Sequence, residues 1–247
     1  MSMKQIHIGN IILNQGMPKI IAPFMPAQTS DIEEQAASFY TTSVDLIEWR
    51  ADYFTGDIFE AMPLIRQALG KVPLLFTLRT EAQGGHYAGN AYAEICRKAL
   101  LSSAFQMIDI EYGHERGGQL IAEAKANGVV AVLSWHDFHH IPSKQELEKI
   151  YSYALRHGAD ILKFAFMPAS ADDIDVVAEL LDTLNIEIPL ITIGMGECGR
   201  ISRVIPEILR SSATFASVLG ASAPGQIDVH TLKAQLNLSV EERLRSF

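Results

Sequence analysis

A lysine stands in the middle of a segment whose other residues predict a buried β-strand. Lys163 belongs to Asp160–Phe166, with the sequence Asp-Ile-Leu-Lys-Phe-Ala-Phe, and a Met-Pro pair ends the run. Lysine is almost never fully buried without a reason, because removing an ammonium from water costs free energy. Burial favours the neutral amine, which can attack a carbonyl carbon and form a Schiff base. The structural alternative is an amine that reaches water or pairs with a carboxylate such as Asp109 or Glu111.

A histidine is predicted to lie beside this lysine. His136 directly follows the preceding apolar segment, Val129–Trp135, and adjacent parallel strands lie roughly 5 Å apart. A histidine at a strand end is often structural, but next to a buried lysine it suits a general acid and base. The cluster His136–His140 also invites a metal hypothesis. Its spacing does not place the imidazoles on one helical face, and no cysteine supports it, so we expect no metal site.

Polar residues occur in pairs at the ends of the predicted strands. The members of a pair are two residues apart, so they share one face of the strand, and their apolar neighbours face the helices. The pairs are Glu48 and Arg50, Thr77 and Arg79, Asp109 and Glu111, and Ser134 and His136. An internal network of salt bridges would explain the first and third pairs. Such a network does not explain why His136 and Lys163 occur at the strand ends. The strand ends therefore predict an active site.

Two glycine-containing segments follow the last two predicted strands. Gly194–Gly199 leads into a helix start that contains Arg203. Its amides could form an anion-binding nest, and the arginine could clamp a carboxylate. The alternative is a flexible loop with solvated arginines. Ala221–Gln226 combines small residues with Pro and Gly, which suits a mobile loop that covers a ligand, with Ser222 and Gln226 as hydrogen-bond partners.

Apolar, β-rich segments alternate with amphipathic stretches, and this order predicts a parallel sheet covered by helices. The predicted strands are Ile20–Phe24, Val44–Arg50, Val72–Arg79, Phe105–Tyr112, Val129–Trp135, Asp160–Phe166, Ile188–Gly194 and Thr214–Leu219. The predicted helices include Ile32–Tyr40, Ala91–Ser102, Lys144–His157 and Ala171–Leu184. Eight such units predict an α/β protein with a (β/α)8 TIM barrel, and 247 residues suit one domain spanning 1–247. An open doubly wound sheet is less consistent, because no glycine-rich dinucleotide fingerprint follows the first strand.

A short β-hairpin is predicted ahead of the first barrel strand. Residues Lys4–Leu13 alternate between polar and apolar types, and Asn14-Gln-Gly16 follows them. We expect this hairpin to plug the N-terminal end of the barrel.

The composition argues against several classes of partner. Apolar residues make up 48% of the chain and charged residues 20%, an ordinary globular composition with material for a deep core. A formal net charge of −9 argues against nucleic acid and anionic membrane surfaces. The first residues lack the apolar core of a signal peptide, and no segment approaches the ~20 apolar residues of a membrane span. Only Cys96 and Cys198 occur, which fits free thiols in a reducing compartment, so we expect a cytoplasmic protein.

Over nearly its whole length the chain resembles the type I 3-dehydroquinate dehydratases of the shikimate pathway. The resemblance is carried by Met17-Pro-Lys-Ile20, Glu48-Trp-Arg50, Phe76-Thr-Leu-Arg79 with Gly84-Gly85, Ser134-Trp-His-Asp-Phe138, Lys163-Phe-Ala-Phe-Met-Pro168, Met195-Gly196, Ser202-Arg203 and Ala221-Ser-Ala-Pro-Gly-Gln226. Each motif alone would be weak, but together they are highly specific.

The resemblance implies a (β/α)8 hydro-lyase of aromatic amino acid biosynthesis. Such an enzyme dehydrates 3-dehydroquinate to 3-dehydroshikimate through a lysine imine, without metal or organic cofactor, and we expect a cytoplasmic homodimer. By position, Lys163 resembles the Schiff-base lysine, His136 the general acid and base, and Arg203 the carboxylate anchor. The residues that resemble those holding the ring hydroxyls and closing the site are Glu48, Arg50, Arg79, Ser222 and Gln226.

Three positions depart from the family pattern. Gln83 stands where many members carry a glutamate that is thought to orient the histidine, so the basicity of His136 is expected to have a different support here. Pro23 stands where many members have serine, and Ile193 where many have methionine. We expect the last two changes to affect packing behind the site and not the chemistry.

Three other functions fit parts of the pattern. A class I aldolase would share the lysine, but it usually acts on phosphorylated sugars, and no obvious phosphate loop exists beyond Gly194–Gly199. A metal-dependent isomerase could use Glu48, Asp109 and His136, and chelators would inhibit it. A catalytically silent barrel could bind a metabolite as a sensor, but it would not need intact Lys163 and His136.

Overall fold

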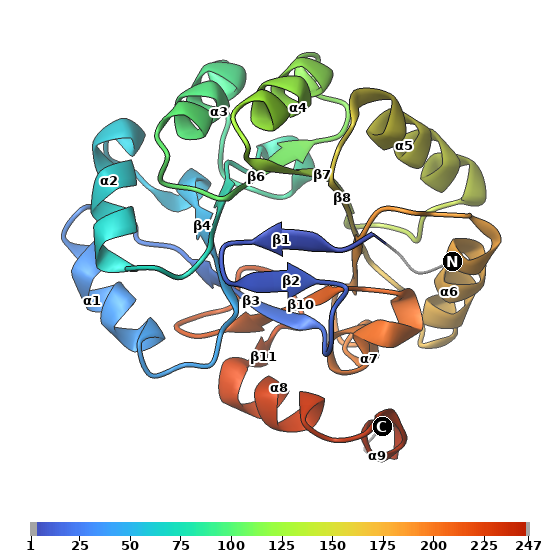
Figure 1. The fold of residues 1–247 in the computed structure, drawn as a ribbon. Helices are drawn as coiled ribbons and strands as arrows, with labels where there is room; N and C mark the ends of the chain where they lie inside the picture. Colours follow the sequence, from blue (N-terminus) through green and yellow to red (C-terminus); the bar gives the residue numbers. More distant parts are fainter. Residues whose placement is uncertain (1–3, 246–247) are drawn as a thin grey trace.

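The computed structural model describes residues 4–245, which form a curled parallel sheet with helices on its outer face (Figure 1). The strand order is β11-β10-β3-β4-β5-β6-β7-β8-β9, and all the pairings are parallel. The strands are β3 (Lys19–Phe24), β4 (Leu46–Arg50), β5 (Leu74–Thr77), β6 (Met107–Glu111), β7 (Val130–Asp137), β8 (Ile161–Phe166), β9 (Leu190–Gly194), β10 (Ala213–Ser217) and β11 (Ile227–Asp228). A parallel bridge between Leu190 in β9 and Ser211, just ahead of β10, brings these two strands together and closes the barrel. The predicted (β/α)8 TIM barrel is therefore confirmed.

A helix follows each of the eight barrel strands and covers the outside of the sheet (Figure 1). The helices are α1 (Asp31–Phe39), α2 (Ile58–Ala68), α3 (Tyr92–Leu101), α4 (Gly117–Ala126), α5 (Lys144–His157), α6 (Asp172–Thr183), α7 (Ile201–Val204), α8 (Val229–Leu236) and the additional α9 (Val240–Leu244), with 3-10 turns η1 (Ala51–Tyr53), η2 (Glu81–Gln83) and η3 (Pro206–Leu209). The four helices predicted by residue range match α1, α3, α5 and α6 to within one residue at each end. No helix within residues 4–245 is long and apolar enough to cross a membrane.

The bounds of α5 illustrate why the sequence predicts helices well here. Ser143 and Glu146 form a capping box, in which the serine oxygen accepts from the Glu146 amide and the Glu146 carboxylate accepts from the Ser143 amide. Gly158 then ends the helix in the left-handed conformation that glycine adopts at low cost. Both signals are local, so they can be recognised without knowing the tertiary structure.

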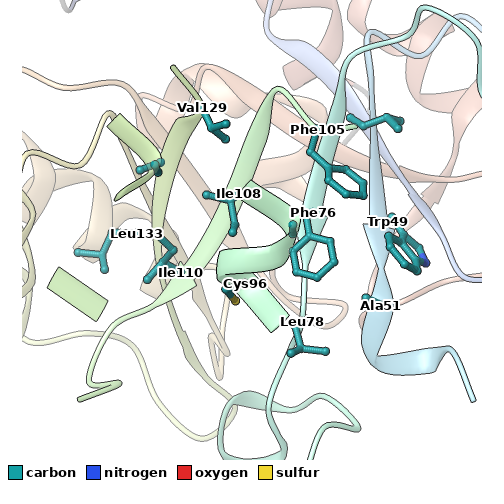
Figure 2. Close-up of a cluster of buried hydrophobic side chains, with 14 of the residues drawn as sticks. Trp49, Ala51, Phe76, Leu78, Cys96, Phe105, Ile108, Ile110, Val129 and Leu133 are labelled. Carbon is teal, nitrogen blue, oxygen red and sulfur yellow. The ribbon is translucent and has the colours of Figure 1, made fainter. Parts of the chain in front are cut away.

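The outward faces of the strands pack against the helices in the main hydrophobic core. Trp49 stacks on Phe105 with ring centroids 5.8 Å apart, and Phe76 contacts both rings (Figure 2). Large aromatic side chains gain the most from burial and from edge-to-face contact. Because this core fixes the outward residues, the alternate residues of the same strands must face the barrel interior.

The barrel interior has an apolar layer near the N-terminal ends of the strands and a polar layer above it. The apolar layer includes Ile21, Leu46, Leu75, Met107, Val132, Ile161, Ile191 and Ala213. Two residues further along β4, β6 and β8, the inward positions hold Glu48, Asp109 and Lys163, all buried. The sheet therefore carries its charged side chains toward the carboxyl ends of the strands, as the paired spacing predicted.

An N-terminal hairpin closes the opposite end of the barrel. Its strands are β1 (Ile6–Ile8) and β2 (Ile11–Leu13), which pair antiparallel and lie across the barrel axis (Figure 1). Their isoleucine and leucine side chains join the apolar layer, which confirms the predicted plug. The turn lies at Gly9 and Asn10, inside the alternating stretch, and not at Asn14–Gly16. Gly9 has φ +56°, a conformation that tight hairpin turns require and that glycine adopts without strain.

The ends of some strands differ from the prediction. Strand β5 is shorter than the predicted Val72–Arg79, whereas β7 extends two residues beyond the predicted end at Trp135. The extension arises because β7 continues to pair with β8 as far as Asp137 opposite Phe166. His136 is consequently held within a strand and is not in a loop.

Candidate active site

A cavity opens at the carboxyl ends of the barrel strands. Its empty volume, which includes the open mouth, is about 500 Å³. The residues singled out from the sequence all line it: Glu48, Arg50, Arg79, His136, Lys163, Arg203, Ser222 and Gln226. The other lining residues are Gln83, Gly84, Phe138, Ala165, Ile193, Met195, Phe215 and Ala223. Most of this second group belongs to the motifs that carry the family resemblance, but apart from Gln83 and Ile193 the sequence assigned these residues no role. Phe215 lies in none of those motifs, because an apolar wall residue carries no chemical signal.

Lys163 is buried, with 5% of its surface exposed, and lies opposite Ser134 on the neighbouring strand. Its Nζ is 3.5 Å from Glu48 Oε1 and 3.4 Å from Asp109 Oδ2. The amine therefore lies between two buried carboxylates. Of the carboxylate partners considered for this lysine, Asp109 is correct and Glu111 is wrong.

A charged network beneath the cavity holds Asp109 in place. Arg79 Nη2 donates to Asp109 at 2.7 Å, and Arg79 Nη1 donates to Glu111 at 3.0 Å and to Ser134 at 2.9 Å. Burial lowers the pKa of Arg79, but the two carboxylates outweigh burial and raise it above its ordinary value. Burial likewise raises the pKa of Asp109, but Arg79 and Lys163 outweigh that effect and lower it. Asp109 therefore stays ionised beside the lysine.

An internal network of salt bridges would require Glu48 and Arg50 to pair with each other. They have other partners. Glu48 Oε1 accepts from Thr77 Oγ1 at 2.9 Å and also faces Lys163. Arg50 donates from Nε and Nη2 to Asp52 at 2.8 and 2.7 Å. Burial lowers the pKa of Arg50, but Asp52 and then Glu48 raise it overall. Sequence reasoning missed Asp52, although an acidic residue two positions after a strand-end arginine was a possible signal.

His136 is held as a neutral imidazole. Burial lowers its pKa well below the ordinary value, and the neighbouring cations Arg79, Lys163 and Arg50 lower it further. A neutral imidazole at neutral pH can accept a proton, so this environment suits a general base.

The tautomer of His136 follows from its contact with Gln83. His136 Nδ1 lies 3.0 Å from Gln83 Oε1, and Gln83 Nε2 donates to the backbone carbonyl of Tyr112 at 3.1 Å. The second bond orients the amide, so its oxygen faces the histidine and accepts from Nδ1–H. Nε2 of His136 is therefore the nitrogen with the free lone pair. Gln83 thus orients the histidine without supplying a charge.

Arg203 is a buried cation without a carboxylate partner in the described part of the chain. It is 1% exposed, its Nη2 donates to the Pro224 carbonyl at 3.0 Å, and its Nε has no hydrogen-bond partner. Burial lowers its pKa to about 10, so it remains a cation at neutral pH. A buried guanidinium that lacks a counter-ion favours an anionic ligand. Arg200, in contrast, is partly exposed and pairs with Glu197 at 2.8 Å.

Two glycine amides in the segment Gly194–Gly199 already have acceptors inside the protein. The amide of Gly194 donates to Ser202 Oγ at 2.9 Å, and the amide of Gly196 donates to the Pro224 carbonyl at 3.2 Å. Both amides are used inside the protein and cannot receive a ligand. An anion at this end of the cavity would instead depend on Arg203.

The segment Ala221–Gln226 contributes Ser222, Ala223 and Gln226 to the cavity wall. The Ser222 amide donates to Gln226 Oε1 at 2.8 Å, and Gln226 Nε2 donates to Ser222 Oγ at 3.0 Å. Gly225 has φ +77°, and a Cβ there would collide with the Gly196 carbonyl. Glycine therefore permits the close approach of this segment to the loop after β9.

The three departures from the family pattern occupy different places. Gln83 lines the cavity and contacts His136. Pro23 is buried in β3 in register with Glu48. Ile193 forms part of the cavity wall, so the expectation that it only packs behind the site is wrong. It faces the interior because β9 alternates and Ile191 is also inward.

The other histidines of the cluster do not join His136. The amides of His139 and His140 donate to Asp137 Oδ1 at 2.8 and 2.9 Å, and the His140 ring faces Asp137 and Glu146. Within residues 4–245 no group of three or more His, Cys, Asp or Glu side chains is arranged to hold a metal ion.

Comparison with known proteins identifies a family. Residues 20–243 match the family model described as type I 3-dehydroquinase. A 3-dehydroquinate dehydratase of Alkaliphilus oremlandii is 36% identical, over 93% of this chain and 95% of the relative. The 3-dehydroquinate dehydratase structure of Geobacillus kaustophilus has a TM-score of 0.88 and 33% identity, covering 96% of both chains. The type I enzyme structure of Clostridium difficile has a TM-score of 0.87 and 30% identity, covering 95% and 97%. The chain belongs to the type I 3-dehydroquinase family.

Proposed function

We propose that this chain catalyses the dehydration of 3-dehydroquinate to 3-dehydroshikimate, a step of aromatic amino acid biosynthesis. The observation that supports it best is that Lys163, a neutral His136 and an uncompensated Arg203 face one cavity. The substrate has a ketone, an adjacent acidic C–H and a carboxylate. These need a nucleophile, a base and an anion anchor respectively, which the three side chains can supply.

The first part of the proposed mechanism is covalent. Lys163 Nζ, as the neutral amine, attacks the C3 ketone, and the carbinolamine loses water to give a protonated imine. Glu48 Oε1 lies 3.5 Å from Nζ and is close enough to take the ammonium proton before the attack. The cationic imine withdraws electrons from C2 and acidifies its C–H bond. The relative from Clostridium difficile was solved with covalent modified comenic acid, which is in line with covalent chemistry in this family.

The second part is proton transfer by His136. Nε2, which holds the free lone pair, removes the C2 proton, and the electron pair forms the C1–C2 double bond as the C1 hydroxyl leaves. The imidazolium gives its proton to that hydroxyl, which departs as water. Water then hydrolyses the imine and returns the amine. One water is released in imine formation and one is consumed in hydrolysis, so the net change is the loss of one water from the substrate.

The remaining cavity residues are proposed to hold the ring. Arg203 would bind the carboxylate bidentately, which fixes the ring relative to Lys163 and His136. Such positioning can remove several kcal/mol from a barrier. The residues proposed to hold the hydroxyls and close the site are Glu48, Arg50, Arg79, Ser222 and Gln226.

A direct assay tests the proposal. Purified protein mixed with 3-dehydroquinate should produce the ultraviolet absorbance of a conjugated enone, at the same rate with and without a chelator. Absence of turnover would contradict the proposed function. Activity that is lost with the chelator and restored by a divalent metal would favour the metal-dependent isomerase. The isomerase has less support, because Glu48 and Asp109 already contact Thr77, Lys163, Arg79 and Ser134.

The setting of the enzyme is also part of the proposal. We propose that the whole chain acts as one catalytic domain, as a homodimer in the cytoplasm. The proposal of one domain is supported by the single barrel sheet, which includes the strands from β3 to β11. Light scattering of the purified protein would test the dimer, and cell fractionation would test the location.

Replacing Gln83 with glutamate should move the acid limb of the pH profile. In the native protein the limb of kcat/KM should lie below pH 6.5, because burial and nearby cations lower the pKa of His136. A carboxylate beside Nδ1 would raise that pKa, so the limb should move up by about one pH unit. The rate should also fall, because a carboxylate cannot donate to the Tyr112 carbonyl as Gln83 Nε2 does. An unmoved limb would mean that another group sets it.

Replacing Gln226 with alanine should weaken substrate binding. The side chain ties Ser222 at two points, so its loss should loosen Ala221–Gln226 and raise KM by about 10-fold, as the loss of one or two hydrogen bonds predicts. Borohydride labelling of Lys163 should persist. The matched control is Gln119→Ala, which removes an exposed amide on α4. We also expect slower proteolysis of the segment when substrate is bound; equal cleavage with and without it would contradict a covering role.

A further inference from the structure

We propose that Asp52 is a positioning residue that connects the cavity-lining Arg50 with the loop that carries Gln83. The inference rests on the proposed function, since it assigns Arg50 to the substrate and Gln83 to the orientation of His136. Asp52 lies in η1, directly after β4, and is not among the residues that line the cavity. Any effect on the reaction must therefore pass through the groups that it holds.

The carboxylate of Asp52 is completely buried and fully used. Its side chain is 0% exposed. Oδ1 accepts from Arg50 Nε at 2.8 Å and from the Arg79 amide at 3.3 Å. Oδ2 accepts from Arg50 Nη2 at 2.7 Å and from the His86 amide at 3.2 Å. Each oxygen thus joins one nitrogen of the guanidinium to one backbone amide of the segment after β5.

These contacts fix the plane of Arg50. Two parallel hydrogen bonds to one carboxylate hold a guanidinium more rigidly than a single bond can. The Tyr53 ring lies 4.9 Å from the guanidinium carbon and restricts the same group from one side. Nη1 has no hydrogen bond to any residue in the range 4–245, so Asp52 leaves this nitrogen available to a ligand in the cavity.

The same carboxylate also fixes both ends of the segment 79–86. The Arg79 amide begins this segment and the His86 amide ends it, and Gln83 lies between them in η2. Gln83 in turn orients the imidazole of His136. One buried carboxylate therefore sets the relative position of a group that holds substrate and of the group that orients the base.

Asparagine cannot replace this carboxylate, although it has nearly the same size. Its amide has one acceptor oxygen, and its NH2 group would face two donors. Asp52→Asn would therefore leave one nitrogen of Arg50 and one backbone amide without an acceptor. A suitable control is Asp45→Asn. Asp45 also accepts from a backbone amide, that of Ile20 at 2.8 Å, but it lies just before the first residue of β4 and does not line the cavity.

The experiment compares the two variants with 3-dehydroquinate as the probe. Asp52→Asn should raise KM by about 10- to 100-fold, as expected for lost charge-assisted hydrogen bonds, and should shift the acid limb of the pH profile. Asp45→Asn should leave both unchanged. In an Arg50→Ala background, Asp52→Asn should change KM much less than it does in the native protein, because the two residues act as a unit.

A second measurement does not depend on turnover. In ¹⁵N-labelled protein, the Arg50 Nε–H and the amides of Arg79 and His86 should exchange slowly, and Asp52→Asn should accelerate all three. Failure of the native protein to dehydrate 3-dehydroquinate would overturn the proposed function alone, and exchange would still decide the role of Asp52. Native KM, pH profile and exchange in a folded Asp52→Asn would overturn the present proposal. Rapid exchange of Arg50 Nε–H in the native protein would overturn it even if that variant does not fold.

Discussion

Replacing Lys163 with alanine should reduce kcat for 3-dehydroquinate by at least about 10⁴-fold, the scale on which removal of a catalytic nucleophile acts. Without the amine no imine can form, and the C2 proton is then only as acidic as it is beside a ketone. Among residues 4–245, Lys163 is the one lysine that lines the cavity, so no other amine can substitute. The measurement is the rate of enone formation at saturating substrate.

Borohydride reduction should identify the same residue directly. Native protein treated with substrate and borohydride should carry one reduced adduct, and peptide mass mapping should locate it on Lys163. Lys149→Ala, which removes an exposed lysine on α5, is the matched control and should label normally. An adduct on a different lysine, or full activity without any adduct, would exclude the imine mechanism while leaving the dehydratase activity itself possible.

The Lys163 variant is expected to fold, which makes the loss of activity interpretable. Removing one partner of a buried ion pair is costly when the other charge is left alone. Here Asp109 keeps Arg79 at 2.7 Å and Ser134 at 2.5 Å, and Glu48 keeps Thr77 at 2.9 Å. Circular dichroism and a thermal unfolding curve would check this. A global loss of structure would mean that Lys163 is needed for the fold as well.

Much of the barrel could be predicted because its signals are local. Alternation along β4, β5 and β6 determines which residues face inward, so the strand-end pairs were assigned to the interior correctly. The order of β7 and β8 along the chain made them neighbours, as parallel strand–helix units usually are. That order placed His136 beside Lys163, and the structure pairs their strands with Ser134 opposite Lys163.

The parts that could not be predicted depend on contacts between distant loops. Gln83 was recognised as uncharged, but its bond to the Tyr112 carbonyl, which fixes the tautomer of His136, is set by the conformation of two loops. The same is true of Asp52, whose partners extend as far along the chain as His86. The acceptors of the Gly194 and Gly196 amides, Ser202 and Pro224, likewise depend on how neighbouring loops fold, so the sequence alone left a nest and a flexible loop as alternatives.

Replacing His136 with alanine should separate imine formation from dehydration. We expect kcat to fall by about 10²- to 10⁴-fold, the usual contribution of a positioned general base. Lys163 keeps a proton acceptor of its own, Glu48, whose Oε1 lies 3.5 Å from Nζ. Attack on the ketone should therefore still occur, and borohydride should label Lys163 in this variant. The control is His139→Ala, because that side chain is exposed and does not line the cavity.

The combination of the two readouts assigns the role of His136. Slow turnover with normal labelling would mean that the histidine moves protons after the imine has formed. Slow turnover without labelling would mean that it is needed for the attack or for loss of water from the carbinolamine, and normal turnover would remove it from the mechanism. The first result is expected, because the pKa of His136 is held low by burial and by Arg79, Lys163 and Arg50. A neutral imidazole with a free Nε2 is better suited to removing a C2 proton than to polarising a carbonyl.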